Sequence, residues 1–409
     1  MKVGKCVVKI NDLNKSFLDA FPIIEKIEDN GYEAYFVGGS VRDTLLNKSI
    51  HDVDIATSAL PEEMKQLFKR TIDIGIEHGT VMVLYEEESY EVTTFRTEST
   101  YLDFRRPESV HFVRSLEEDL KRRDFTINAL AMSKDGHVID YFNGLEDLKA
   151  ERIKAVGDAS ERFHEDALRM MRAVRFVSQL QFTLEDLTKA AVKEHSGLLE
   201  KIAVERIQIE FVKLLLGPGR KEGMTAFIET DLFTYCPGLK NKENELLKLA
   251  EVNGQIESSD AAWTLLVYFL QLEPKEINRF MRAWKCSKKE INTVTHVYEG
   301  LLQRKDKQLS NLQMYHLGLD HAILVEIVAK HLNLPSNIEE TISRFHMLPI
   351  KEVSELAVTG TDIIKDLDQK PGKWLGDLLN QLQVKVVEER LANDKDTLLA
   401  YAKQELNIE

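Results

Sequence analysis

The pattern of hydrophobic residues changes near residue 150, and this change constrains the fold more than any other feature of the sequence. Before that point, short β-like runs mix irregularly with helical stretches: a helix is expected at 17–29 and strands at 34–37, 52–57, 80–85, 90–95 and 137–141. After it, the spacing is that of amphipathic helices, at 161–180, 184–195, 203–216, 261–272 and 275–286. Since strands and helices do not alternate regularly, we predict an α+β head followed by an all-helical remainder, not a doubly wound sheet.

Length and composition narrow the class of protein. At 409 residues, the chain is too long for one compact domain. With 43% hydrophobic and 30% charged residues, it has the composition of a globular protein and not of a disordered one. No apolar run reaches the roughly 18 residues that a membrane-spanning helix needs, and the first residues do not form a secretory signal. Three distant cysteines give neither a disulfide nor a zinc pattern. We therefore expect a cytoplasmic protein.

The net charge of −14 bears on nucleic-acid binding. Acidic residues outnumber basic ones in both halves of the chain, and there is no basic domain or tail. A protein that holds RNA by non-specific electrostatics normally shows a basic stripe. Any nucleic-acid role must therefore rest on local clusters such as Arg105-Arg106 and Lys121-Arg122-Arg123.

The first motif is Gly38-Gly39-Ser40-Val41-Arg42-Asp43, between an expected strand and an expected helix. Two glycines allow the backbone to approach a phosphate, Ser40 can donate a hydrogen bond to it, and a helix N-terminus favours negative charge. Taken alone, a Gly-Gly turn before a helix is more often only a turn.

A pair of carboxylates follows at Asp52 and Asp54. Residues i and i+2 of a strand point to the same face, so both side chains can converge on one site. Carboxylates at this spacing suit Mg²⁺ ions that bridge to substrate phosphates, although an isolated pair is more commonly part of a solvated strand edge. Glu91, on the strand expected at 90–95, is a third candidate, with an exposed hairpin position as the alternative.

A dense block runs from Arg122 to Ala129. Its arginines can neutralise a triphosphate, and Asp124 can accept a hydrogen bond from a ribose hydroxyl. The alternative is a solvated charge run, but the apolar residues that follow indicate a partly buried segment.

The last block, Glu165 to Arg169, lies on an expected helix with Arg172 one turn further on. Asp166 and Arg169 are three residues apart and so share a face of that helix. A carboxylate acceptor beside a guanidinium donor can pair with an amino group next to a ring nitrogen, which cytosine and adenine present and uracil and guanine do not. The alternative is a salt bridge on a solvated helix.

These four motifs, in this order and spacing, resemble the class II tRNA nucleotidyltransferases, which comprise CCA-adding enzymes and bacterial poly(A) polymerases within the polymerase-β-like superfamily. The later Glu205-Arg206-Ile207 segment also fits. Thr359-Gly360-Thr361-Asp362 and Pro371-Gly372 resemble the C-terminal region of CCA-adding enzymes from Gram-positive bacteria. The resemblance covers almost the whole chain.

The resemblance implies an organisation in four parts. These are a polymerase-β-like nucleotidyltransferase head at 1–150, a helical neck with base recognition at 151–216, a helical body at 217–330 and a helical, tRNA-binding tail at 331–409. The segment from Thr97 to Val113 lies where the family has a flexible loop, and its presence favours addition of the complete CCA.

The resemblance also implies roles for individual residues. Asp52 and Asp54 would bind the catalytic Mg²⁺, with Glu91 as a third catalytic carboxylate. Asp166 and Arg169 would read the incoming base, Arg123 would contact phosphates and Asp124 the ribose. The rest of the predicted nucleotide-binding set is Gly38, Gly39, Ser40, Arg42, Asn128, Arg172 and Arg175.

The expected reaction is template-independent addition of C-C-A to the 3′ end of tRNA from CTP and ATP, with release of pyrophosphate. The expected partners are therefore tRNA, through its 3′ end and its acceptor and elbow regions, together with CTP and ATP, and no membrane. A poly(A) polymerase or an A-adding enzyme shares the active-site motifs and is the main alternative. A non-catalytic RNA-binding protein on the same scaffold is a remote one. A metal phosphohydrolase built on His51-Asp52, or on His164 with Asp166, lacks a second histidine cluster at suitable spacing.

Overall fold

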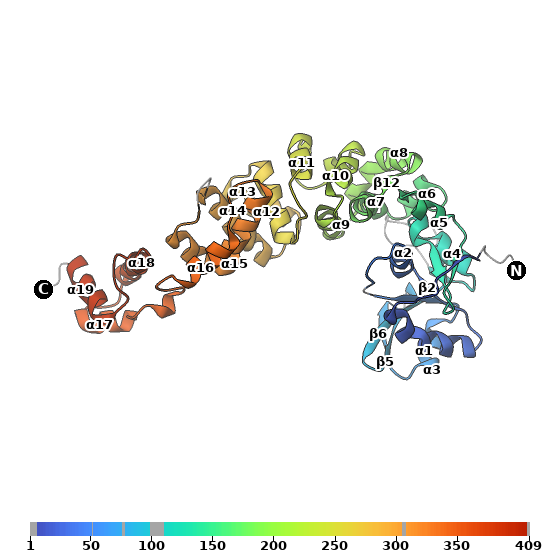
Figure 1. Ribbon diagram of the computed structural model, residues 1–409, viewed down its shortest axis with the longest axis horizontal. Coiled ribbons are helices and arrows are strands. Elements are labelled where there is room, and N and C mark those ends of the chain that lie inside the picture. Colours follow the sequence, from blue (N-terminus) through green and yellow to red (C-terminus); the bar gives the residue numbers. More distant parts are fainter. Residues whose placement is uncertain (1–5, 51, 76–77, 99–109, 305–307, 407–409) are drawn as a thin grey trace. The chain divides into compact units, whose positions relative to one another are not determined.

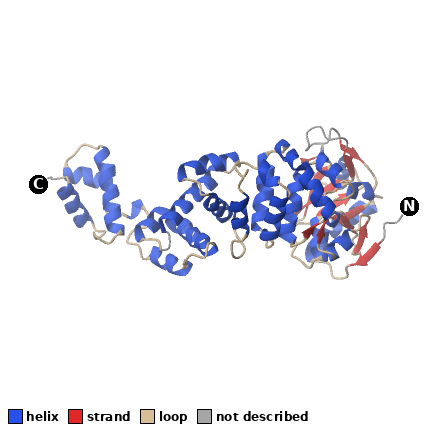
Figure 2. Cartoon of the chain, turned by 90° about the horizontal axis from the view of Figure 1, so that it is seen from above, coloured by secondary structure: helices blue, strands red, loops and turns tan. Residues whose placement is uncertain are grey.

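The computed structural model describes residues 6–50, 52–75, 78–98, 110–304 and 308–406. The chain forms two compact units, Met1–Ala250 and Glu251–Glu409. Within the described ranges, every strand belongs to the first unit and the second is helical, as the red and blue elements of Figure 2 show.

The first unit contains a mixed eight-stranded sheet in the order β1-β10-β9-β2-β3-β6-β5-β4. Figure 1 labels β2, β5 and β6 of this sheet. Neighbouring strands are antiparallel except β3 and β6, which are parallel. Two further short strands, β7 and β8, form a separate antiparallel pair. The strands are β1 Cys6–Lys9, β2 Ala34–Val37, β3 Asp54–Thr57, β4 Thr71–Gly75, β5 Thr80–Tyr85, β6 Glu88–Thr94, β7 Arg96–Glu98, β8 Val110–Phe112, β9 Leu130–Met132 and β10 His137–Asp140.

The central strand β2 separates two apolar layers. Successive residues of a strand point to opposite faces. On one face, the ring of Phe36 packs against Phe17 of α1 (Lys15–Asp29), with centroids 4.7 Å apart. On the other, Val37 joins a buried cluster with Leu116 and Leu120 of α4 (Leu116–Lys121). Helices α1 and α4 therefore cover opposite faces of the sheet, and α4 ends directly before the Arg122-Arg123-Asp124 block.

The rest of the first unit is largely helical. The other helices are α2 Gly39–Leu45, α3 Pro61–Leu67, α5 Gly144–Lys149, α6 Ala159–Glu165, α7 Leu168–Leu180, α8 Asp186–His195, α9 Val204–Leu216, α10 Arg220–Glu229 and α11 Glu243–Ala250. Short 3₁₀ turns lie at Thr126–Asn128, Ser196–Lys201 and Leu232–Tyr235. One small difference from the sequence prediction is a parallel pair of two-residue strands beyond residue 150, β11 Arg152–Ile153 and β12 Thr183–Leu184.

The helix predicted at 161–180 is wrong in one respect, because it is broken at Asp166. Helix α6 ends at Glu165 and α7 begins at Leu168, while Asp166 has extended backbone angles (φ −137°, ψ 102°). The Asp166 carboxylate accepts a hydrogen bond from the backbone N–H of Leu168 at 3.0 Å. Such a side-chain bond to an exposed N–H is how a new helix is commonly started.

The second unit consists of packed helices and contains a buried aromatic pair, formed by α12 (Ser259–Leu270) and the end of α13 (Pro274–Ala283). The rings of Trp263 and Trp284 lie 5.3 Å apart and both residues are fully buried. A buried ion pair joins Arg304 to both carboxylate oxygens of Glu326 at 3.0 and 2.9 Å. The helices are α12 Ser259–Leu270, α13 Pro274–Ala283, α14 Lys288–Arg304, α15 Asn311–His331, α16 Ile338–His346, α17 Gly360–Leu367, α18 Lys373–Val387 and α19 Lys395–Glu405, with a 3₁₀ turn at Val353–Glu355.

The predicted α+β head followed by helical regions is confirmed. The hairpin of β5 and β6 lies where the sequence placed it, whereas the strand expected from residue 52 begins at Asp54. Of the predicted loop at 97–113, residues 99–109 lie outside the described residues. No described helix is long and apolar enough to cross a membrane.

Candidate active site

A cavity of about 720 Å³ in the first unit is lined by α2, the segment after α4, α7 and α9. Three carboxylates, Asp54, Asp124 and Asp166, are found in its described lining. The arginines of the same lining are Arg42, Arg96, Arg122, Arg123, Arg169, Arg172, Arg175 and Arg206. Guanidinium groups bind phosphates through paired, charge-assisted hydrogen bonds. Such an excess of arginine therefore suits a polyphosphate ligand, and we call this space the arginine cavity.

A second cavity of about 560 Å³ has the opposite character. Its described lining includes five carboxylates and neither lysine nor arginine. The carboxylates of this acidic cavity are those of Asp19, Asp52, Asp54, Glu88 and Glu91. Asp54 lines both cavities, so its carboxylate lies where the acidic and the arginine-rich linings meet.

The acidic cavity perturbs its own carboxyl groups. Burial, followed by the charges of Asp54 and Asp52, raises the pKa of Glu91. Burial also raises the pKa of Asp54, with Arg123 opposing and Asp52 adding to the effect. Mutually repelling carboxylates favour a divalent cation, which relieves the repulsion and accepts oxygen ligands. Within the described residues, no three His, Cys, Asp or Glu side chains already surround one point, but this donor set fits a hard divalent ion.

The turn between β2 and α2 brings the backbone to the wall of the arginine cavity. Gly38 has φ = +74°, a conformation that residues with a Cβ rarely adopt. A Cβ at this position would also lie 3.1 Å from Nη1 of Arg123. Ser40 differs from the prediction, because its buried hydroxyl donates to the carbonyl oxygen of Val37 at 3.2 Å and lines neither cavity.

Arg42 begins a chain of polar contacts along the cavity wall. Its Nε and Nη2 each lie 2.9 Å from an oxygen of Asp43, and its Nη1 donates to Oδ1 of Asn128 at 2.6 Å. The amide of Asn128 in turn donates to Oδ1 of Asp124 at 3.1 Å. The sequence-distant motifs at 38–43 and 122–129 are thereby joined through one asparagine.

Asp124 is 8% exposed and is held as an anion. Its second oxygen accepts a hydrogen bond from Nε of Arg172 at 2.7 Å, and Oδ1 also accepts from the backbone N–H of Phe125. Burial alone would raise the pKa of Asp124, but the charge of Arg172 and the bonds from Asn128 and Arg172 outweigh burial and lower it to about 2. Asp124 is therefore a fixed hydrogen-bond acceptor at neutral pH.

Asp166 and Arg169 both line the arginine cavity but do not pair with each other. The two oxygens of Asp166 face Nη2 and Nη1 of Arg206, at 2.8 and 3.3 Å. Arg169 donates to Glu165 at 2.6 Å and to the carbonyl oxygen of Arg122 at 2.9 Å. The expectation that both share one helical face is wrong, because Asp166 precedes α7.

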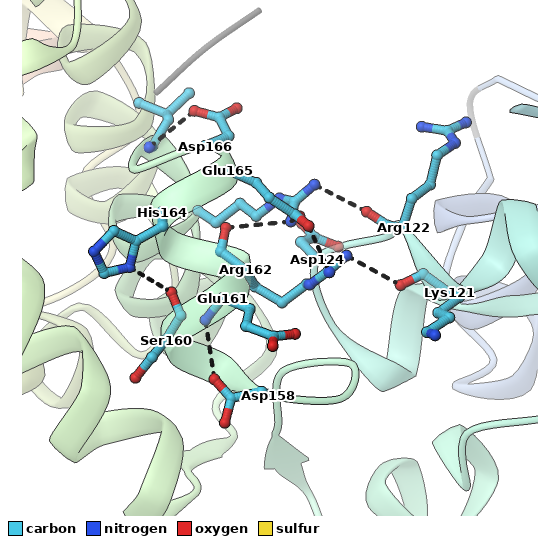
Figure 3. Close-up of polar contacts among 12 residues, drawn as sticks. Lys121, Arg122, Asp124, Asp158, Ser160, Glu161, Arg162, His164, Glu165 and Asp166 are labelled. Atoms are coloured by element: carbon cyan, nitrogen blue, oxygen red, sulfur yellow. Dashed lines mark hydrogen bonds and ion pairs between the residues drawn. The ribbon is translucent and has the colours of Figure 1, made fainter. Parts of the chain in front are cut away.

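Helix α6 is tied to the end of α4 beside these residues. Arg162 donates to the carbonyl oxygen of Lys121 at 3.4 Å and pairs with Glu165, as Figure 3 shows. His164 lies on the same helix with Nδ1 2.8 Å from the carbonyl oxygen of Ser160, and it lines neither cavity (Figure 3). Of the two histidines weighed for a phosphohydrolase, His51 lies outside the described residues.

Three arginines surround the ring of Phe176. The guanidinium carbons of Arg42, Arg172 and Arg175 lie 5.2, 5.4 and 3.9 Å from its centroid. Arg175 is 7% exposed and pairs with Glu210 at 2.8 Å. Burial lowers the pKa of Arg175 to about 10, with Glu210 opposing. Cation–π contacts of this kind hold guanidinium groups against an aromatic wall.

The two cavities gather most of the predicted site residues. The acidic cavity takes Asp52 and Glu91 together with Asp54. The arginine cavity takes Gly38, Gly39, Arg42, Asp54, Arg123, Asp124, Asn128, Asp166, Arg169, Arg172 and Arg175.

Three family models match consecutive parts of the chain. Residues 34–154 match the poly A polymerase head domain. Residues 181–243 match a probable RNA and SrmB-binding site of polymerase A, and residues 254–402 match a putative domain 2 of tRNA nucleotidyltransferase.

Relatives that match nearly the whole chain distinguish between a poly(A) polymerase and a tRNA nucleotidyltransferase. The chain is 53% identical to the CCA-adding enzyme of Enterococcus faecalis over 97% of its own length and 98% of the relative's. It is 51% identical to that of Levilactobacillus brevis, with 96% and 99% coverage. The chain belongs to the CCA-adding enzyme family. A solved structure of the Bacillus stearothermophilus CCA-adding enzyme in complex with CTP matches with a TM-score of 0.91 at 41% identity, covering 97% of this chain and 98% of that one.

This membership of the CCA-adding enzymes confirms the resemblance carried by the four motifs. The match to tRNA nucleotidyltransferases also extends through the second unit. The poly(A) polymerase models do not match there, but a tRNA nucleotidyltransferase model does.

Some site residues of this CCA-adding family member were missed in the sequence. Phe176 is not among the predicted site residues, and an aromatic residue on an amphipathic helix is typical of a core. Asp119 is also absent from the prediction; it is 1% exposed and contacts Arg122 and Arg123. Its spacing of three and four residues from these arginines was the available signal.

Proposed function

We propose that this chain adds C-C-A to the 3′ end of tRNA, using CTP and ATP and releasing pyrophosphate. The observation that carries the proposal is the arrangement of the two cavities, one rich in arginine and one acidic, that share Asp54. This arrangement suits a nucleotide triphosphate whose phosphates face arginines on one side and a cation on the other. The two relatives of about 50% identity that span the chain, both CCA-adding enzymes, support the choice of reaction.

In this proposal, Asp52 and Asp54 hold Mg²⁺, and Glu91 contributes the third carboxylate. When bound, the metal would supply charge neutralisation for the phosphates and would favour deprotonation of the attacking hydroxyl. Ionised carboxylates are the ligands that Mg²⁺ prefers, and the raised pKa values of Asp54 and Glu91 lie in the direction that bound cations reverse.

The 3′-hydroxyl of the RNA attacks the α-phosphorus, and the bond to the departing pyrophosphate breaks. Arg42 and Arg123 stabilise the charge on the phosphates, and the turn at Gly38-Gly39 lets the backbone approach them. Asp124, fixed as an anion by Arg172, accepts from a ribose hydroxyl. Catalysis then consists of positioning and electrostatic stabilisation, without a covalent intermediate.

Asp166 and Arg169 recognise the base in this proposal. In the structure Asp166 pairs with Arg206 and Arg169 with Glu165. The Asp166 carboxylate has further lone pairs with which to accept a bond from the base while Arg206 holds it. Once aligned, the carboxylate accepts from the amino group of cytosine or adenine while the guanidinium donates to the adjacent ring nitrogen. Uracil and guanine present the opposite pattern and are rejected.

The proposal includes the four-part organisation, with the head at 1–150, the neck at 151–216, the body at 217–330 and a tRNA-binding tail at 331–409. The break in family matches between residues 154 and 181 is compatible with the first boundary. It also includes a cytoplasmic location, since tRNA and the two nucleotides are cytoplasmic molecules.

The test uses the full chain, Mg²⁺, CTP and ATP with a tRNA transcript that ends at the discriminator base. Products are resolved at single-nucleotide length. Growth by three nucleotides, C-C-A, is expected. A long ladder of A would instead identify a poly(A) polymerase, addition of A only to a transcript ending in CC would identify an A-adding enzyme, and no extension would leave an RNA-binding protein.

A further inference from the structure

One buried carboxylate lies behind the arginine cavity without lining it. Asp119, on α4, is 1% exposed. Its Oδ1 accepts from Nε and Nη2 of Arg122 at 3.0 and 2.8 Å, and its Oδ2 accepts from Nη2 of Arg123 at 3.2 Å. Both arginines line the cavity. Asp119 therefore acts on the ligand space through its contacts with these two side chains.

Asp119 is held as an anion by its partners. Burial alone would raise its pKa, but the charges of Arg122 and Arg123 and their hydrogen bonds outweigh burial and hold the pKa below its ordinary value. A buried carboxylate between two guanidinium groups forms short charge-assisted bonds in fixed directions. The two arginine side chains therefore have less rotamer freedom left to lose when a ligand binds, and binding costs less conformational entropy.

The contact with Asp119 is decisive for the position of Arg123. Nη1 of Arg123 lies beside the Gly38 turn, and its Nε is buried without a hydrogen-bond partner in the described part of the chain. The side chain of Arg123 is 19% exposed. Its direction is therefore determined by the contact of Nη2 with Asp119 and by the residues packed around it.

The same end of α4 also supports the base-recognition segment. The carbonyl oxygen of Arg122 accepts a hydrogen bond from Nη2 of Arg169 at 2.9 Å. Asp119 itself accepts a long hydrogen bond, 3.4 Å, from the backbone N–H of Arg96 at the start of β7. A shift of Arg122 would therefore displace Arg169, and a shift of Asp119 would displace the backbone at Arg96.

We propose that Asp119 is a positioning residue that presets Arg122 and Arg123 for the phosphates of the incoming nucleotide. This rests on the proposed function, in which these arginines face a triphosphate. The competing interpretation is that Asp119 only stabilises the first unit, as other buried ion pairs do.

The two interpretations differ in how the loss of Asp119 depends on the phosphates of the ligand. We would measure equilibrium binding of CTP, CMP and inorganic tripolyphosphate to the wild type and to Asp119→Asn, which keeps the shape but removes the charge. The proposal predicts that CTP and tripolyphosphate bind about ten-fold more weakly, because both arginines lose their charged partner. The affinity for CMP should change less than about two-fold. Because the ligands are compared on the same variant, a fraction of inactive protein affects all three binding measurements equally.

Two further variants complete the test. Glu326→Gln disrupts a buried arginine–carboxylate pair in the second unit and should leave all three affinities unchanged. Asp119→Glu keeps the charge and should recover most of the CTP affinity. This variant also provides a test if Asp119→Asn does not fold.

An equal loss for CTP and CMP, or no loss for either, would overturn the proposal for Asp119 while leaving the proposed function intact. A wild-type protein that bound neither CTP nor tripolyphosphate would overturn the proposed function itself.

Discussion

Replacing Asp124 with asparagine tests whether the centre of the arginine cavity is organised by a buried anion. The wild-type carboxylate accepts hydrogen bonds from Arg172, Asn128 and the backbone N–H of Phe125. Asparagine has nearly the same shape but carries no charge, so Arg172 loses its ion-pair partner. Both the stability of the first unit and its dependence on pH should change.

The magnitude follows from the pKa of Asp124, which falls from 3.8 to about 2 in the folded protein. Such a fall corresponds to about 2 kcal/mol of folding free energy at pH 7. Because the folded pKa is depressed, this contribution is complete above the unfolded pKa and is lost as pH falls through the folded value. At pH 3 about half of the contribution at pH 7 should remain.

Urea unfolding at pH 7 and pH 3, followed by far-UV circular dichroism, measures both values. Trp263, Trp284 and Trp374 are the three tryptophans of the chain and all belong to the second unit. Their fluorescence therefore reports on the second unit alone and gives an internal control, because Asp124→Asn should leave that transition unchanged.

The reasoning is refuted if the variant and the wild type differ by less than about 0.5 kcal/mol at pH 7, the size of an ordinary surface substitution. A difference at pH 3 as large as that at pH 7 would also refute it, since it would show that the charge of Asp124 is not the cause.

Three other changes have distinct expected results. The combined Asp52→Ala and Asp54→Ala variant should lose at least about a thousand-fold in nucleotide transfer while keeping its far-UV spectrum, because the proposed metal ligands are removed. Transfer near the wild-type rate in the extension assay would contradict this. Arg206→Leu removes the bidentate partner of Asp166, the carboxylate proposed to read the base. Discrimination of CTP against UTP should therefore fall about ten-fold in single-nucleotide incorporation, and unchanged discrimination would show that Arg206 does not orient Asp166. Glu326→Gln leaves a buried arginine without its charged partner and should cost about 3 kcal/mol in the transition followed by tryptophan fluorescence; a cost below about 0.5 kcal/mol would contradict that estimate.

The strands and most helices could be predicted because local hydrophobic patterns determine them. The hairpin of β5 and β6, for example, is two apolar runs separated by charged residues. The break at Asp166 could not be predicted in this way, because apolar residues such as Phe163 and Met170 continue the helical pattern across it. What stabilises the break is a bidentate contact from Arg206, forty residues further along the chain.

The same distinction applies to the site. Asp52 and Asp54 could be predicted from their spacing of two residues, and Glu91 from a neighbouring expected strand; all three line one cavity. Asp119 ends an acidic run, followed by a basic one, that would ordinarily be solvated. Its burial depends on packing between α4 and the sheet, which no local pattern reveals.

The most direct test of the proposed reaction offers all four nucleotides at once. A tRNA transcript ending at the discriminator base is incubated with the protein, Mg²⁺ and equal concentrations of ATP, CTP, GTP and UTP, and the 3′ ends are sequenced. We predict C-C-A on nearly every extended molecule and no further growth. Incorporation of U or G at the first added position, or a tail of A residues, would contradict both the proposed reaction and the role of Asp166 and Arg169 in reading the base.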